Sequence, residues 1–210
     1  MTSSAQAAQE ILRSGSQFQW YVIPLLAIVM YIYAVESKNK NWGAVFAGLA
    51  FWGMDWFNEI WNGLVFHFTG FAPVWGAPGK TAFLLLIGLN IEICFMFAIA
   101  GIAWSKLLPE DKQQKILGIP NRWFVAVAGS IFCVLVEMFL NSIGALTWEY
   151  SWWSIRAPWL IFLVGYLPFF LVAFWVYDMD TIKKQVKIVG SILGFDIMLL
   201  IIFGAILNWI

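Results

Sequence analysis

Charged residues are scarce in this chain, and histidine is almost absent. Asp, Glu, Lys and Arg make up 11% of its 210 residues, whereas a soluble domain carries about 25%. Hydrophobic residues reach 62%, the mean hydropathy is +0.80 and the net charge is zero. The composition is therefore that of a membrane protein in contact with a lipid bilayer, and no excess of basic residues indicates a nucleic-acid partner.

The sequence also offers few ligands for a metal or a redox cofactor. Its one histidine, His67, excludes bis-histidine haem and histidine-box di-iron centres, which need several. Cys94 and Cys133 lie in apolar runs, so we interpret them as buried packing residues rather than as a disulfide or a metal site. We expect no metal and no cofactor. Aromatic residues, in contrast, are abundant at 19%, including 14 Trp.

Six apolar runs predict an all-α fold, a polytopic bundle of six transmembrane helices. Each run is close to the roughly 20 residues that a spanning helix needs. The runs cover residues 17–35, 43–68, 81–105, 122–147, 158–178 and 188–209. Residues 1–16 are polar and are expected to form a tail or a surface helix, so the remaining residues, 17–210, make up one transmembrane domain.

The distribution of basic residues predicts the orientation of this multi-pass chain in a cell membrane. Loops 36–42, 106–122 and 179–187 contain nine of the twelve Lys and Arg residues. Because cytoplasmic loops are enriched in Lys and Arg, both termini are expected on the outer face. The two outer loops, 69–80 and 147–157, are rich in Trp, Pro and Gly. They are interpreted either as an interfacial aromatic belt or as a lid over a cavity.

A loose internal repeat relates two pairs of expected helices. The segment Glu59-Ile-Trp-Asn62-Gly63 resembles Glu137-Met-Phe-Leu-Asn141, and an aromatic-rich outer loop follows each segment. The helix that follows each loop carries a glycine, Gly88 or Gly165, at a similar distance from the glutamate. Helices 2 and 3 would then repeat as helices 4 and 5, in the same orientation.

Five acidic residues lie inside the expected spans, where a charge costs about 2.5–3.5 kcal/mol on insertion scales. They are Asp55, Glu59, Glu92, Glu137 and Asp196. At the helical rise of 1.5 Å per residue, all five lie roughly 13–20 Å below the outer face, so four helices bring carboxylates to one layer. Asp55, Glu59 and Asn62 share one helix face. Asn62 and Asn141 each lie one turn outward of a glutamate, where an amide can orient the acid.

Two interpretations of this acid layer remain open. Each acid could be a hydrogen-bonded contact between helices, worth under about 1 kcal/mol. Alternatively, the acids form a site. The spans contain no Lys or Arg partner for them, so at least one of Glu59, Glu92 and Glu137 is expected to be protonated at neutral pH. A neutral acid can donate a proton, carry protons or join a cation site.

Short patches of the chain resemble two groups of small integral-membrane cyclases. Trp56-Phe57-Asn58-Glu59 in the second span and Asp196 in the last are similar to the places where meroterpenoid-type terpene cyclases carry their two essential acids. The chain also resembles membrane lycopene cyclases. The resemblance implies a helical bundle without a metal box, in which buried acids protonate an epoxide or an alkene of an isoprenoid lipid.

The first candidate function is therefore an intramembrane acid-catalysed enzyme. We expect Glu59 to donate the proton, with Glu137 and Asp196 as a supporting acid and a base, and Asp55 and Glu92 as further candidates. A carbocation needs aromatic walls, which stabilise it by cation–π attraction. The expected substrate-binding residues are Trp52, Trp56, Trp61, Asn62 and Asn141.

Two further functions fit the same acids. The chain could be a proton- or cation-coupled transporter or channel, and its small size would then require a homo-oligomer. It could instead be a non-catalytic subunit that binds lipids, pigments or partner helices. Gly190 and Gly194, four residues apart in the last span, give weak support to helix–helix contact of that kind.

Overall fold

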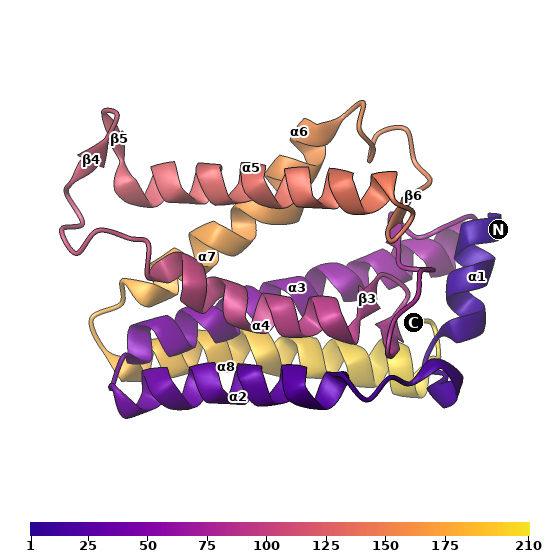
Figure 1. Cartoon of the computed structure of the whole chain (residues 1–210), viewed down its shortest axis with the longest axis horizontal. Helices are drawn as coiled ribbons and strands as arrows, with labels where there is room; N and C mark the ends of the chain where they lie inside the picture. The colour runs from indigo at the N-terminus through magenta and orange to yellow at the C-terminus, as the bar shows by residue number, and fades with distance from the viewer.

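Long helices lie side by side and bring both chain termini to one end, as a computed structural model of the chain shows (Figure 1). The structure describes residues 1–210, apart from the side chain of Gln17. We call the end with the termini the terminal face and the opposite end the basic face. The terminal face includes loops 70–90 and 143–157, and the basic face includes loops 39–41, 106–120 and 178–181.

The long helices run between these two faces. They are α2 (Val22–Lys38), α3 (Trp42–Thr69), α4 (Ile91–Ser105), α5 (Asn121–Ser142), α7 (Leu167–Tyr177) and α8 (Ile182–Leu199). A short α6 (Pro158–Leu160) and a π-helical segment, η2 (Ile161–Tyr166), lead into α7, and α8 continues into a second π-helical segment, η3 (Leu200–Ile206). At the terminal face lie α1 (Ser3–Ile11) and the 3-10 turn η1 (Gly15–Gln17).

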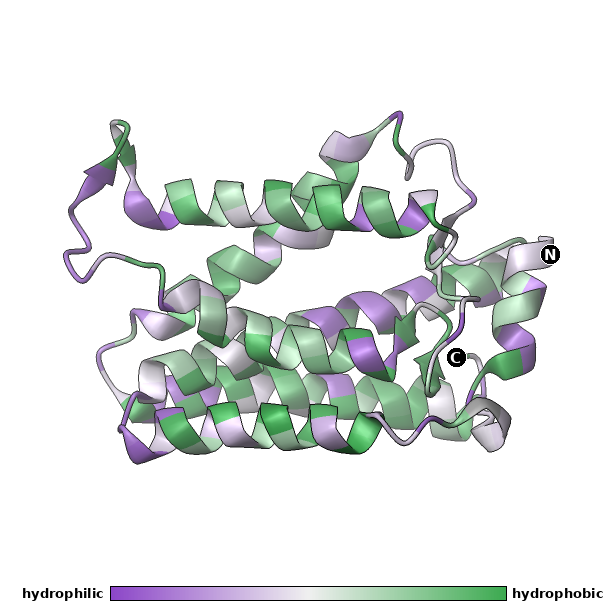
Figure 2. Cartoon of the chain, viewed as in Figure 1, coloured by the Kyte–Doolittle hydropathy of each residue, from purple (hydrophilic) through white to green (hydrophobic). Residues whose placement is uncertain are grey.

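Three helical segments are long and apolar enough to cross a membrane. They are Asn121–Ser142, Pro158–Tyr177 and Ile182–Ile206. The segment Ile91–Ser105 is apolar but shorter. Figure 2 shows mainly hydrophobic helices, with hydrophilic residues gathered in the loops at the basic face and also along α3. Length and composition thus support three candidate spans, fewer than the six expected.

The third apolar run differs from the expected helix over 81–105. Part of it forms a hairpin of β2 (Leu84–Leu86) and β3 (Leu89–Asn90), and α4 begins only at Ile91. Asn90 caps this helix, because its side-chain oxygen accepts a hydrogen bond from the backbone N–H of Ile93 at 2.8 Å. An apolar run alone does not distinguish a strand from a helix, so hydropathy placed the helix start ten residues too early.

Other helix ends also differ from the expected bounds. α2 runs from Val22 to Lys38 rather than over 17–35. α5 ends at Ser142 rather than at 147, and Gly144 follows with a φ of 74°, a left-handed conformation that suits glycine. α8 begins at Ile182 rather than at 188, because Thr181 caps it and its first turns are polar. Hydropathy therefore extended α5 past a glycine turn and missed the polar start of α8.

α3 is the central helix and packs against α4, α7 and α8. Its close approach to α4 requires Gly101, where a Cβ would lie 2.4 Å from the backbone oxygen of Ala47. Two short antiparallel strand pairs lie in the loops besides the β2–β3 hairpin. They are β1 (Trp75–Gly76) with β6 (Thr147–Trp148) at the terminal face, and β4 (Lys115–Ile116) with β5 (Ile119–Pro120) at the basic face.

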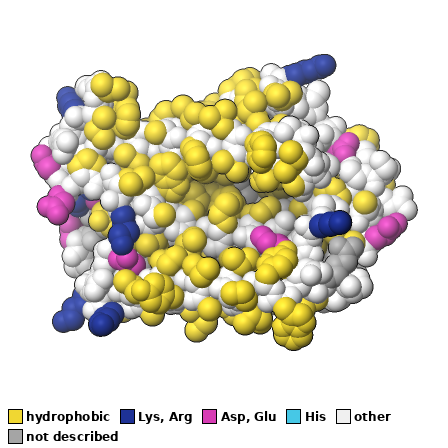
Figure 3. All heavy atoms as spheres, viewed as in Figure 1, with side chains coloured by type: hydrophobic (Ala, Val, Ile, Leu, Met, Phe, Trp, Pro, Cys, Tyr) yellow, Lys and Arg dark blue, Asp and Glu magenta, His cyan; other side chains and the backbone are white. Residues whose placement is uncertain are grey.

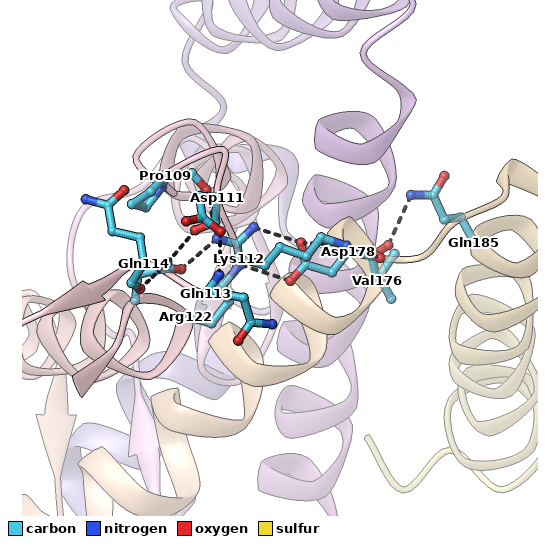
Figure 4. Close-up of polar contacts among 10 residues, drawn as sticks. Pro109, Asp111, Lys112, Gln113, Gln114, Arg122, Val176, Asp178 and Gln185 are labelled. Carbon is cyan, nitrogen blue, oxygen red and sulfur yellow. Dashed lines mark hydrogen bonds and ion pairs between the residues drawn. The ribbon is translucent and has the colours of Figure 1, made fainter. Parts of the chain in front are cut away.

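Polar side chains join α5, α7 and α8 at the basic face (Figure 4). The guanidinium of Arg122 donates to both carboxylate oxygens of Asp178, each at 2.9 Å. Lys112 Nζ lies 3.6 Å from the same carboxylate. The side-chain amide of Gln185 donates to the backbone oxygen of Val176 at 3.0 Å. This end of the bundle is therefore held by charged and polar contacts.

Candidate functional site

A cavity of about 240 Å³ lies among α3, α4, α5 and the η2–α7 segment. Three acids reach it, Asp55 and Glu59 from α3 and Glu137 from α5. Its aromatic lining residues are Trp75, Phe97, Phe132, Trp153, Tyr166 and Phe169. The structure thus brings together three of the five acids that the sequence singled out, in a largely apolar space.

Glu59 is buried, with 3% of its surface exposed. Its Oε1 accepts a hydrogen bond from the indole Nε1 of Trp75 at 2.7 Å, whereas its Oε2 has no hydrogen-bond partner within the described part of the chain. A Cβ on Gly88 would lie only 2.7 Å from this free oxygen. Gly88 therefore lets the β2–β3 turn cover the acid at close range.

Asn62 fixes the loop that holds Trp75 over Glu59. It lies one turn from Glu59 on α3 and is fully buried. Its side-chain oxygen accepts from the backbone N–H of Val74 at 2.7 Å, and its side-chain nitrogen donates to the backbone oxygen of Trp75 at 2.7 Å. The side-chain amide of Asn62 thus orders the loop above Glu59, because buried backbone groups need hydrogen-bond partners.

Glu137 has a similar arrangement on α5. Its Oε1 accepts a hydrogen bond from the indole Nε1 of Trp148 at 2.9 Å. Asn141, one turn further along the helix, donates through its side-chain nitrogen to the backbone oxygen of Leu146 at 3.0 Å. In both helices, an asparagine one turn from the glutamate binds the loop whose tryptophan donates to that glutamate.

The loops close the cavity at the terminal face. In the β1–β6 pair Trp75 lies opposite Trp148, and the ring of Trp75 stacks on that of Trp153 with centroids 5.3 Å apart. The hydroxyl of Tyr150 donates to the backbone oxygen of Ala72 at 2.9 Å, which joins the two loops again. The arrangement is that of a lid over the acids.

Aromatic packing closes the cavity towards the basic face. The ring of Phe51 lies 5.7, 5.4 and 5.0 Å from those of Phe97, Phe169 and Phe170. Phe97 and Phe169 also line the cavity. This cluster fills the space below the acids with closely packed rings, as in an ordinary protein interior.

Polar atoms without partners gather in the cavity. Besides Glu59 Oε2, they are Asp55 Oδ2 and the indole Nε1 of Trp153, neither of which has a hydrogen-bond partner among the described residues. A buried polar group without a partner costs about 1–3 kcal/mol. Such groups in an otherwise packed protein are candidates for contact with a ligand.

Glu92 and Asp196 do not line this cavity. Glu92 lies in the first turn of α4, where its carboxylate accepts from the backbone N–H of Ala82 at 2.7 Å and from the hydroxyls of Thr81 and Tyr21. It therefore orders the loop before α4 and takes no part in the cavity. Asp196 is buried beside Gly53 of α3, and both its carboxylate oxygens are unpaired in the described structure.

The tryptophans expected as cavity walls pack elsewhere. Trp52 donates its indole N–H to the sulfur of Cys94 at 3.2 Å, and Trp56 packs with it in the cluster around Ile60. Trp61 is partly exposed and contacts the ring of Trp75. The reason is rotation about α3, because Asp55, Asn58 and Glu59 point to the cavity and the tryptophans leave that face.

Sequence reasoning missed the aromatic residues that do line the site. Trp75 and Trp153 lie in loops, where no periodic pattern indicates their direction, although both loops were recognised as candidate lids. Tyr166 lies in the π-helical segment η2, two residues before Pro168. π-Helical turns occur often at functional sites, and the proline was the available signal for an irregular helix there.

Within the described residues, no group of three or more His, Cys, Asp and Glu side chains is arranged to hold a metal ion. Cys133 lines the cavity with Glu137, while Cys94 is buried under Trp52. Both thiols are free. What the arrangement offers chemically is carboxyl groups and aromatic rings in an apolar space.

The fold and the site define a helical membrane protein whose central helices enclose carboxyl groups in an apolar cavity. Residues 2–205 match an uncharacterized membrane protein family, and the chain belongs to that family. It is 63% identical over 209 residues to an uncharacterized protein of Archaeoglobus fulgidus, a match that covers 100% of this chain and 99% of that protein. A second protein of that organism is 60% identical over 53 residues, which are 25% of this chain and 95% of that protein.

No solved structure matches the chain. The family assignment supports a location in a membrane. It provides no link to the terpene cyclases or the lycopene cyclases that short patches of the sequence resemble.

Proposed function

We propose that this membrane protein is an intramembrane enzyme that protonates an apolar lipid, in a cyclisation or an isomerisation. The observation that carries the proposal is the free Oε2 of Glu59, buried in a cavity with aromatic walls. A carboxyl group there is stable in its neutral form, because an isolated charge is costly in an apolar medium. A neutral carboxylic acid is the group that can donate a proton to a weakly basic substrate.

An isoprenoid with an epoxide or an alkene suits this site. Glu59 would transfer its proton to the epoxide oxygen or to an alkene carbon. The C–O bond of the epoxide or the π bond of the alkene then breaks, which leaves a positive charge on a carbon atom. The rings of Trp75, Trp153 and Tyr166 could stabilise the carbocation by cation–π attraction. The unpaired indole N–H of Trp153 supplies a donor for a substrate oxygen, which favours the epoxide.

The reaction ends when the carbocation loses a proton. In a cyclisation, an alkene attacks the cationic carbon, a new C–C bond forms, and an adjacent C–H bond then breaks to give a double bond. An ionised Glu137 or Asp55 would accept that proton, because both line the cavity, and would return it to the carboxylate of Glu59, which restores the neutral acid. Asp196 does not, so we do not assign it this step. The substrate and product are isomers, and no oxidant or reductant is needed.

The test is a comparison of extracted membrane lipids. The chain and its Glu59→Gln variant are expressed in a host that makes isoprenoids, and the lipids are compared by mass spectrometry. Loss of a general acid lowers the rate by about 10²–10⁴-fold, so Glu59→Gln should abolish the product. Glu10→Gln is the matched control, since Glu10 is exposed on α1 and only accepts from Gln6. It should leave the product unchanged.

A proton- or cation-coupled transporter is the second candidate. Its support is that three carboxyl groups share one cavity within a membrane protein. The lid and the aromatic cluster count against a continuous water path. If wild-type lipids equal those of the Glu59→Gln variant, and vesicles containing the protein show a proton or cation flux that depends on Glu59, this function replaces the enzyme.

We also propose six spans with both termini outside. The support is the position of nine of the twelve Lys and Arg residues near the basic face. In a variant without native cysteines, Gln113→Cys at the basic face should resist a membrane-impermeant thiol reagent in intact cells. Ser151→Cys at the terminal face should react. The opposite pattern would reverse the orientation.

A further inference from the structure

The cavity has an opening on the side of the bundle, between α4 and α5. Two of its lining residues, Met96 of α4 and Phe132 of α5, are 46% and 55% exposed. Figure 3 shows a hollow here, surrounded by hydrophobic side chains. α5 is one of the three helices long and apolar enough to cross a membrane, so an opening beside it faces the bilayer.

Packed side chains cover the two ends of the cavity. The β1–β6 pair and the stacked rings of Trp75 and Trp153 cover the terminal face of the cavity. The cluster around Phe51 fills the side towards the basic face. A molecule that reaches Glu59 without unfolding the lid therefore comes from the side.

We infer that the groove between α4 and α5 is a lateral portal, through which a lipid chain passes from the bilayer to the acids. Only the reaction of that lipid at the acids rests on the proposed function. Both sides of the opening are apolar, as Met96 and Phe132 show, so a hydrocarbon chain crosses it without losing hydrogen bonds. A polar or charged solute would have to leave water and cross the bilayer first.

The portal also restricts the class of substrate. Glu59 is ten residues from the end of α3 at Thr69, or roughly 15 Å along the helix. The reacting group of the lipid must therefore lie well away from a headgroup at the terminal face. Drug-sized ligands occupy pockets of about 300–1,000 Å³. A cavity of about 240 Å³ holds only part of a long lipid, and the rest remains in the groove or in the bilayer.

The test uses a fatty alcohol with a diazirine in the middle of its chain, mixed into phosphatidylcholine vesicles that contain the protein. Light releases nitrogen and gives a carbene, which inserts into nearby bonds of the protein. Attached probe at the buried residues Asp55 and Glu59 reports passage through the portal, and attached probe on exposed residues of α8 reports ordinary lipid contact. Peptide mass spectrometry separates the two.

Met96→Trp should obstruct the opening, and Met198→Trp is its matched control. Met198 is 45% exposed on α8 and does not line the cavity. We expect Met96→Trp to lower probe attachment on α3 roughly tenfold, because the larger side chain fills the opening, with no change on α8. Met198→Trp should leave attachment on α3 unchanged.

The possible outcomes separate the portal from the reaction. No attachment at Asp55 or Glu59 in the wild type, or equal attachment in the Met96→Trp variant, overturns the portal. Attachment that Met96→Trp blocks supports the portal even if the lipids of cells with and without Glu59→Gln are identical. In that case only the proposed catalysis fails.

Discussion

Trp75 and Trp148 lie opposite each other in the β1–β6 pair, and each donates its indole N–H to a different buried glutamate. The glutamates are Glu59 of α3 and Glu137 of α5, at 2.7 and 2.9 Å. The two acid–tryptophan pairs therefore meet at one small sheet above the cavity. A change in one loop can reach the other acid through the strand pair.

The first prediction concerns the protonation of Glu59. In purified protein at neutral pH, infrared spectroscopy should show a band from a protonated carboxyl group, because one oxygen of Glu59 is buried without a partner among the described residues. Glu59→Gln should remove this band, while Glu10→Gln should not. If the Glu59→Gln spectrum equals that of the wild type, Glu59 is ionised, and a bound cation becomes the better explanation.

The second prediction concerns the close contact at Gly88. A Cβ there would lie 2.6–2.7 Å from atoms of Asn62, Trp75 and Glu59. Gly88→Ala should lower stability by about 1–3 kcal/mol through overpacking, and the carboxyl band of Glu59 should shift. Stability is measured by thermal unfolding in detergent.

Gly190→Ala is the matched control for that variant. Gly190 lies in α8, and a Cβ there would meet no other described atom within 4 Å. Alanine in a helix is favoured over glycine by about 1 kcal/mol, so this variant should be as stable as the wild type or slightly more stable. Equal losses in both variants would contradict close packing on Glu59.

The third prediction is a pH dependence at the basic face. Glu36 lies just past the apolar run 17–35, and it accepts from Lys106 Nζ at 2.5 Å and from Asn41 at 2.8 Å. The hydrogen bond from Lys106 lowers the pKa of Glu36 below its ordinary value of 4.5. As the pH falls, the unfolded chain therefore binds a proton at Glu36 at a higher pH than the folded protein does. The contact stabilises the fold fully at pH values above the pKa of Glu36 in the unfolded chain.

This stabilisation should be lost as the pH falls from 4.5 through the lowered pKa. The Tm of the wild type in detergent should therefore drop on acidification more than the Tm of Glu36→Gln, which cannot titrate at this position. Glu10→Gln controls for acid effects elsewhere in the chain. If the wild type and Glu36→Gln lose the same Tm on acidification, the ion pair does not contribute.

Much of the arrangement around Glu59 could be predicted from helical periodicity, because Asp55 and Glu59 are one turn apart on a helix of 28 residues. Glu92 could not be placed, since the start of its helix depends on the cap at Asn90 rather than on hydropathy. Asp196 could not be placed either, because rotation about α8 is set by packing against Gly53. The contact between Trp75 and Trp153 joins two loops far apart in sequence, and no local pattern encodes it.

The last prediction compares the two asparagines. Asn62→Leu keeps a similar volume but leaves the N–H of Val74 and the backbone oxygen of Trp75 without their buried partner. Each unpaired group costs about 1–3 kcal/mol. Asn141→Leu removes only one bond, of 3.0 Å, at a partly exposed position, so about 0.5–1.5 kcal/mol is expected.

The two variants should also differ at the acids, because Asn62 holds the loop that carries Trp75 over Glu59. Asn62→Leu should lower the Tm more than Asn141→Leu does, and it should shift the carboxyl band that Glu59→Gln removes. Asn141→Leu should leave that band in place, since its loop serves Glu137. If both variants lower the Tm equally and neither moves the band, Trp75 is positioned by the strand pair with Trp148 instead of by Asn62.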